Sequence, residues 1–156
     1  MTKQEFMDLC HREFTRRGFK KSKRVYYLKG DGLLCGLYIQ RSSYGGDYCY
    51  IDYNFFIGNY PLVKNYPSIY ESDYCERFMY RTKDNASDEY YWAAMLEYSR
   101  TEEDICDIFT HVFNEHIMPI IQGDYELFKR DVNNCTHMLD EEKEILINKI
   151  ELLQKK

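Results

Sequence analysis

The sequence lacks long apolar runs and the short motifs that define common enzyme classes. No apolar run approaches the ~18 residues that a membrane-spanning helix requires, and the residues after Met1 contain no apolar core of a secretion signal. We therefore expect a soluble, cytoplasmic protein with no membrane partner. The segment Tyr44-Gly45-Gly46-Asp47 lacks the lysine and the following helix of a phosphate-binding loop, and it is typical of a turn.

The cysteines form no Cys-x-x-Cys pair, so they carry no metal-binding signature. There are six, scattered along the chain at Cys10, Cys35, Cys49, Cys75, Cys106 and Cys135. Without a secretion signal, such cysteines are typical of free thiols in a reducing compartment. We expect them to be buried, because an unpaired cysteine behaves as a small apolar side chain.

Histidine is scarce, and its few positions complete no catalytic or metal-binding set. His111 and Glu115 stand one helical turn apart, but no third ligand lies near them in the sequence. Two cysteines have a histidine close by, in Cys10-His11 and Cys135-Thr136-His137. Neighbours on a helix or strand point apart, so this proximity does not indicate a nucleophilic pair. We expect no catalytic residue, no metal and no cofactor.

Tyrosine is abundant, and twelve of the sixteen tyrosines fall between Tyr44 and Tyr98. The hydrophobic fraction of 44% and the charged fraction of 30% are ordinary, and the length fits a single domain over residues 1–156.

The net charge of −5 is unevenly distributed along the chain. Residues 1–60 hold ten basic and six acidic groups, whereas residues 61–156 hold eleven basic and twenty acidic groups.

Six basic residues near the N-terminus lie within a short stretch that contains no acidic residue. They are Arg16, Arg17, Lys20, Lys21, Lys23 and Arg24. Such a cluster, together with aromatic residues on a sheet, is compatible with single-stranded nucleic-acid binding. The overall acidity argues against that function. We favour a helix end, where arginine complements the helix dipole, followed by a solvated turn.

The N-terminal half reads as one helix followed by three strands. Thr2 and Glu5 form a capping box and Gly18 is a typical helix stop, so a helix is expected over residues 3–17. The strands are expected at residues 25–28, 33–41 and 48–57.

Alternating apolar residues fix how the second and third strands pair. Directly opposed residues must share a face, and a two-residue loop at Gly45-Gly46 would oppose the outward Gln40 to the inward Ile51. A loop with an odd number of residues, here the three residues 44–46, removes this conflict. The expected pairs are Ile39 with Ile51, Gln40 with Tyr50, and Tyr38 with Asp52.

The second half is expected to hold a long loop, two short strands and several helices. The loop covers residues 59–87 with a strand near 76–81, and a further strand near 90–96 carries Trp92. Helix caps are expected at Thr101, Asp124 and Asp140, with Pro119 ending or kinking a helix near Met118. This order describes an α+β fold: an antiparallel sheet of about five strands, with the N-terminal helix and the C-terminal helices packed on one face.

Short motifs spread along the chain carry a family resemblance. They are Gly18-Phe19-Lys20-Lys21, Tyr26-Tyr27, Ile39-Gln40-Arg41-Ser42, the third strand through Asn54, the strand with the tryptophan, and Ile117-Met118-Pro119. In these motifs the chain resembles the bacterial family catalogued as domain of unknown function 4304, over roughly residues 3–130. The resemblance implies an α+β fold and no particular activity.

The polar side of the predicted hairpin is the candidate functional surface. Tyrosine combines a large contact area with a hydrogen-bonding tip, and here it alternates with amide and acidic groups. The candidate binding residues are Tyr38, Gln40, Tyr48, Tyr50, Asp52 and Asn54. We predict that this face binds another protein, in the manner of an inhibitor or immunity protein. The alternative is a small-molecule-binding protein or an enzyme, with a pocket between this face and the 59–87 loop and Asp52 as general base.

The cysteine pattern yields a direct prediction. All six thiols should react with a thiol reagent in denaturant without prior reduction, because a reducing compartment keeps them unpaired. The measurement is a thiol count on protein freshly purified from a reducing cytosol, with a reduced sample as control. A higher count after reduction would reveal a disulfide and contradict the prediction.

Overall fold

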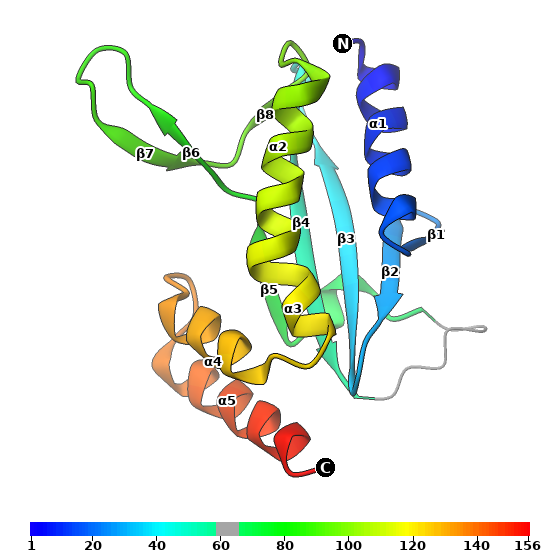
Figure 1. The fold of residues 1–156 in the computed structure, drawn as a ribbon, viewed down its shortest axis with the longest axis vertical. Coiled ribbons are helices and arrows are strands. Elements are labelled where there is room, and N and C mark those ends of the chain that lie inside the picture. Colours follow the sequence, from blue (N-terminus) through cyan, green and yellow to red (C-terminus); the bar gives the residue numbers. More distant parts are fainter. Residues whose placement is uncertain (59–65) are drawn as a thin grey trace.

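The computed structural model, which describes residues 1–58 and 66–156, shows an antiparallel sheet with helices on one face (Figure 1). The strand order is β1-β2-β3-β4-β5, and β8 pairs with the start of β4. The strands of this sheet are β1 (Lys20–Ser22), β2 (Val25–Lys29), β3 (Leu33–Arg41), β4 (Tyr48–Ile57), β5 (Tyr74–Arg77) and β8 (Leu96–Glu97). The predicted α+β class is confirmed.

The helical elements follow the predicted order along the chain. They are α1 (Lys3–Arg16), the 3-10 turn η1 (Ile69–Glu71), α2 (Glu102–Val112), the π-helical turn η2 (Phe113–Ile117), α3 (Met118–Ile121), α4 (Tyr125–Asn134) and α5 (Asp140–Gln154). Within the described ranges, no helix has the length and apolar character needed to cross a membrane.

The local signals for α1 are confirmed. Glu5 N–H donates to Thr2 Oγ1 at 3.1 Å, and Thr2 N–H donates to Glu5 Oε2 at 2.7 Å, which completes the capping box. Gly18 follows the helix at φ = +98°, a conformation that residues with a Cβ rarely adopt.

The prediction that the basic residues after Gly18 lie in a turn is only partly correct. The basic stretch is not all turn, because Lys20–Ser22 forms β1 and pairs with β2, which leaves Lys23 and Arg24 in the turn.

The C-terminal helices follow the prediction with one shift. Of the predicted end or kink near Met118, the structure has no helix end: the helix is interrupted by the π-helical turn η2 and continues as α3. Pro119 has no N–H to donate, and a π-helical turn is one way to absorb the lost α-helical bond. The cap of α5 is displaced by one residue: Leu139 is the cap, and its N–H donates to the Glu142 carboxylate at 3.0 Å, so Asp140 is already helical.

The β3–β4 hairpin has the predicted register. Ile39 lies opposite Ile51, Gln40 opposite Tyr50, and Tyr38 opposite Asp52. The last pair of the ladder joins Arg41 to Cys49, so the connecting loop has the odd length that the alternation of side chains requires.

The two short strands predicted later in the chain are four strands in the structure. The expected strand near residues 76–81 is divided between β5 and β6 (Tyr80–Lys83), and that near 90–96 between β7 (Tyr90–Ala93) and β8. β6 and β7 form a separate two-stranded ribbon that projects from the body (Figure 1). Phe78 marks the division, because its fully buried side chain holds the chain against the core between β5 and β6.

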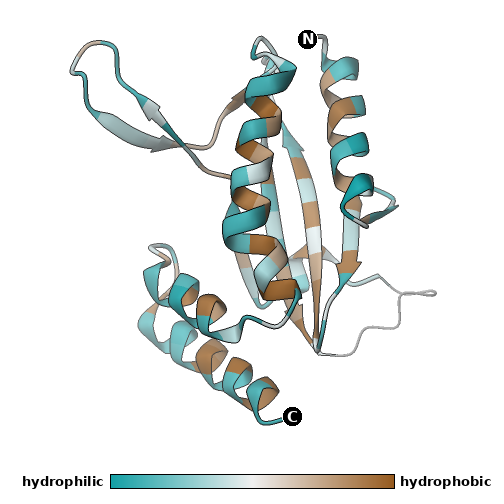
Figure 2. Cartoon of the chain, in the orientation of Figure 1, coloured by the Kyte–Doolittle hydropathy of each residue, from teal (hydrophilic) through white to brown (hydrophobic). Residues whose placement is uncertain are grey.

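The core lies between the helices and the inner face of the sheet. Phe55 of β4 is fully buried, and its ring centroid lies 5.0 Å from that of Phe128 in α4. The ring centroids of Phe14 in α1 and Phe109 in α2 lie 5.5 Å apart, and this contact joins α1 to α2 over the sheet. Apolar and polar segments alternate along these helices in Figure 2, as packing on one side requires.

Removal of the Phe55 ring tests this core. Phe55→Ala should lower the free energy of unfolding by ~3–5 kcal/mol, because it leaves a cavity at a fully buried position. Urea denaturation followed by circular dichroism measures the change. Tyr44→Ala, at a side chain 97% exposed, is the control and should shift stability by no more than about 0.5 kcal/mol. Equal effects at both positions would contradict the assigned core.

Candidate functional site on the outer face of the sheet

The candidate residues from the sequence lie on the side of β3 and β4 that faces away from the helices. Tyr38 pairs with Asp52 and Gln40 pairs with Tyr50, so these four side chains share the outer face. Tyr48 continues the row, and its ring meets that of Tyr50 edge to face at a centroid distance of 5.8 Å. Gln40 is exposed and the other four are half-buried.

Arg77 of β5, which the sequence analysis does not select, organises the centre of this face. Its guanidinium donates to Asp52 Oδ1 at 3.0 Å and to Gln40 Oε1 at 2.9 Å. The same group stacks on the Tyr50 ring, 4.3 Å from the ring centroid. Charge-assisted hydrogen bonds and stacking thus hold side chains from three strands in one arrangement. We call Gln40, Tyr50, Asp52 and Arg77 the arginine cluster.

Asp52 is the electrostatically unusual member of the arginine cluster. Its side chain is only 16% exposed. Burial raises the pKa of its carboxyl group above the ordinary value, and the hydrogen bond and positive charge of Arg77 partly oppose this rise. One carboxylate oxygen is already bonded to Arg77. This contact stabilises the ionised carboxylate and so lowers the basicity that a general base at Asp52 would need.

Asn54 lies on the outer face but is not part of an accessible surface, since only 2% of the residue is exposed. Its Nδ2 donates to the Gly36 carbonyl at 3.3 Å, and its Oδ1 accepts from Ser72 Oγ at 3.2 Å. Both polar ends are therefore used inside the fold, as is usual for a buried amide. The accessible part of the face ends before this residue.

The outer face beyond this point is apolar and covered. Tyr27, Leu34 and Phe56 form a second buried cluster. Tyr66 covers it, with its ring centroid 4.6 Å from that of Tyr27, and Tyr27 Oη donates to the Pro67 carbonyl at 2.6 Å. The outer face thus has a covered apolar end and an open polar end.

A groove of about 410 Å³ runs beside the open end. The sheet side is formed by residues of β3, β4 and β5, namely Tyr38, Gln40, Asp52, Asn54 and Cys75, and the other side by Ile69, Tyr70 and Ser72. This is where the alternative hypothesis places a pocket, between the face and the 59–87 loop. Residues 59–65 of that loop lie outside the described residues.

Two predictions about cysteine and histidine are wrong. All six thiols are free, but Cys75 is exposed and Cys106 is half-buried. Cys135 Sγ lies 3.3 Å from His137 Nε2, so these two side chains do not point apart as expected. The two residues occupy the loop between α4 and α5, where side chains do not follow the divergence found along a helix or strand. His111 and Glu115 belong to no three-ligand cluster within the part of the chain that the structure describes.

An antiparallel sheet with helices on one face and an open polar cluster on the other defines an α+β protein with an exposed sheet surface. The sequence matches the family described as Domain of unknown function (DUF4304) over residues 10–123 of 156. The chain belongs to this family, as its motifs predict. The match includes the whole sheet and ends just before α4. No curated protein and no solved structure matches the chain.

The arginine cluster predicts a change in the titration of Asp52. Arg77→Met should raise the Asp52 pKa further, because burial is retained while the opposing positive charge is lost. The pKa can be measured by NMR of the side-chain carboxyl carbons. Arg81→Met is a matched control, since Arg81 stacks on Tyr90 in the projecting ribbon. An Asp52 pKa that falls or stays constant in Arg77→Met would show that the ion pair is not formed in solution.

Proposed function

We propose that this chain is a non-enzymatic protein-binding module whose partner docks on the open end of the outer face. The observation behind the proposal is the arginine cluster, in which Arg77 is held between Asp52, Gln40 and the Tyr50 ring. Arginine and tyrosine are enriched among residues that dominate binding at protein interfaces. Side chains that are already held in place lose less conformational entropy when a partner docks.

Two highly exposed tyrosines enlarge this surface. Tyr44 lies in the turn that joins β3 to β4, and Tyr70 lies in η1 on the far wall of the groove. They are 97% and 90% exposed. Large aromatic rings near a preordered polar centre are typical of interface composition. A partner that spans both tyrosines would cover the arginine cluster between them.

In its finer form, the proposal is an inhibitor-like or immunity-like module of a bacterial cytoplasm. Two observations support it. All six cysteines are free, which fits a reducing compartment. The carboxylate of Asp52 is paired with Arg77, and this positive charge lowers its basicity, so the surface is better suited to contact than to proton transfer.

The groove favours a second candidate function, small-molecule binding. Its volume of about 410 Å³ is within the range of small-ligand sites. A ligand there would contact Ile69 of η1, whereas a protein docked over Tyr48 and Tyr50 would not need this side chain. Ile69→Ala would therefore weaken ligand binding and leave protein binding intact.

Tyr50→Ala tests the protein-binding proposal. Its ring is half-buried on the open face, so the change should leave the melting temperature nearly unchanged while weakening partner binding more than tenfold, ~1.4 kcal/mol or more. Affinity capture from the native cell, with mass spectrometry of the bound protein and titration of that protein, measures the effect. Leu152→Ala, at an exposed position of α5, is the control. Undiminished binding by Tyr50→Ala would contradict the proposed surface.

A further inference from the structure

A second group of polar side chains lies at β5, separate from the arginine cluster. Glu76 of β5, Cys135 at the end of α4 and His137 in the following loop bring a carboxylate oxygen, a sulfur and an imidazole nitrogen within 4.8 Å of one another. His137 Nε2 is 3.3 Å from Cys135 Sγ and 3.5 Å from Glu76 Oε2. Among the described residues, no other group of three such ligands is present.

We propose that Glu76, Cys135 and His137 bind one zinc ion. Zinc–ligand bond lengths around a tetrahedral ion place a thiolate sulfur and an imidazole nitrogen about 3.5 Å apart, and the nitrogen and a carboxylate oxygen about 3.3 Å apart. The observed separations of 3.3 and 3.5 Å are close to these values, and the third pair, the Cys135 sulfur and the Glu76 carboxylate oxygen, lies within 4.8 Å. A single ion can therefore reach all three atoms with small side-chain movements.

The chemistry of the ligand set selects zinc over the common hard cations. Thiolate and imidazole are preferred by Zn²⁺, whereas Mg²⁺ and Ca²⁺ take oxygen ligands. The thiolate of Cys135 and the carboxylate of Glu76 together balance the two positive charges of the ion, while His137 binds as neutral imidazole. The bound site is thus neutral, which suits its half-buried position.

The fold positions the ligands from two sides. Cys135 caps α4 and is only 4% exposed, so its sulfur is fixed by the end of the helix. The other oxygen of Glu76, Oε1, accepts from Arg77 N–H at 3.0 Å, which leaves Oε2 directed to the ion. The His137 side chain is 54% exposed, so an ion can enter from solvent.

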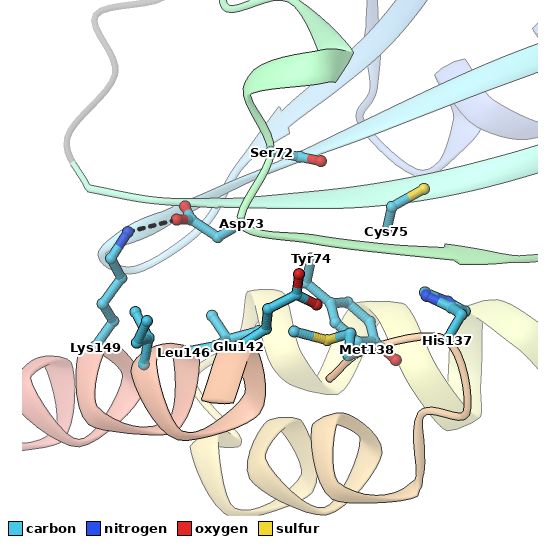
Figure 3. Close-up of a pocket in the computed structure, with 10 residues that line it drawn as sticks. Ser72, Asp73, Tyr74, Cys75, His137, Met138, Glu142, Leu146 and Lys149 are labelled. Carbon is cyan, nitrogen blue, oxygen red and sulfur yellow. Dashed lines mark hydrogen bonds and ion pairs between the residues drawn. The ribbon is translucent and has the colours of Figure 1, made fainter. Parts of the chain in front are cut away.

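Three protein ligands leave the fourth zinc position for water, the arrangement of zinc sites that exchange a ligand. His137 also borders a pocket of about 350 Å³ between β5 and α5, shown in Figure 3. Asp73 and Lys149 form an ion pair at 2.7 Å at the opposite end of this pocket. The ion would thus hold the loop between α4 and α5 to the edge of the sheet at one end, as this ion pair holds α5 at the other.

Cys135 and His137 both lie beyond residues 10–123, the region that matches the family. Two of the three ligands therefore come from the α4–α5 hairpin, outside the matched region. The zinc proposal does not rest on the proposed partner binding, because the three ligands are not members of the arginine cluster.

Metal titration of the chelator-stripped chain tests the proposal. Calorimetry should show one Zn²⁺ per chain, and the Co²⁺ complex should show a thiolate-to-metal charge-transfer band. His137→Ala and Glu76→Gln should each weaken Zn²⁺ binding at least tenfold, and Cys135→Ala should abolish the band. Binding should weaken as pH falls, because protons compete for the thiolate and the imidazole. Cys75→Ala and His111→Ala are matched controls, since both residues are exposed and lie outside the cluster.

Three results of the Zn²⁺ titration would each overturn the proposal: no stoichiometric binding by the wild-type chain, one ion shared by two chains, or full affinity in His137→Ala. Loss of the charge-transfer band in Cys75→Ala, with retention in Cys135→Ala, would do the same. The test does not depend on the buried Cys135 variant remaining folded, because His137 is exposed and its replacement leaves the core intact. Circular dichroism of each variant confirms the fold.

Discussion

The pairing of β3 with β4 is the constraint on which the rest of the structure depends. Strand side chains alternate between two faces, so one register sends Leu37 and Phe55 toward the helices and Gln40 and Tyr50 away from them. A slip of one residue would exchange the faces, burying polar groups and exposing the core. The hydrophobic core and the candidate surface are therefore two consequences of the same hydrogen-bonded ladder.

On the outer face of the sheet, the residue composition of each end determines whether other side chains must cover it. At one end Leu34 and Phe56 are apolar, and Tyr66 packs against the buried cluster to which they belong. At the other end Gln40 and Asp52 satisfy their polar groups through Arg77 and can remain in contact with water. The open end is thus stable as it stands, and a partner would add contacts rather than complete an unfinished core.

The edge strand β5 links the two proposed sites. Its pairing with β4 places Arg77 opposite Asp52 and Glu76 opposite Tyr53. Because successive strand residues point to opposite faces, these two neighbours serve different sites: Arg77 completes the arginine cluster, and Glu76 meets Cys135 and His137. The proposals remain separable, since each has its own side chains and its own experiment.

The sequence by itself determined what depends on neighbours along the chain. The capping box at Thr2, the stop at Gly18 and the alternation through β3 and β4 are short-range signals, and they predict these elements, their register and the outward direction of Tyr50 and Asp52. Family membership follows from motifs in the same region. These signals hold because capping and strand parity are properties of a few consecutive residues.

Only the tertiary structure decided which distant segments meet. Arg77 reaches Asp52 across 25 positions of sequence, and Glu76 reaches His137 only because the α4–α5 hairpin packs beside β5. Asn54 likewise accepts a hydrogen bond from Ser72, 18 positions further along the chain. No periodic pattern in the sequence predicts these contacts. They form because the burial of apolar residues brings distant segments together, and polar groups on those segments then pair.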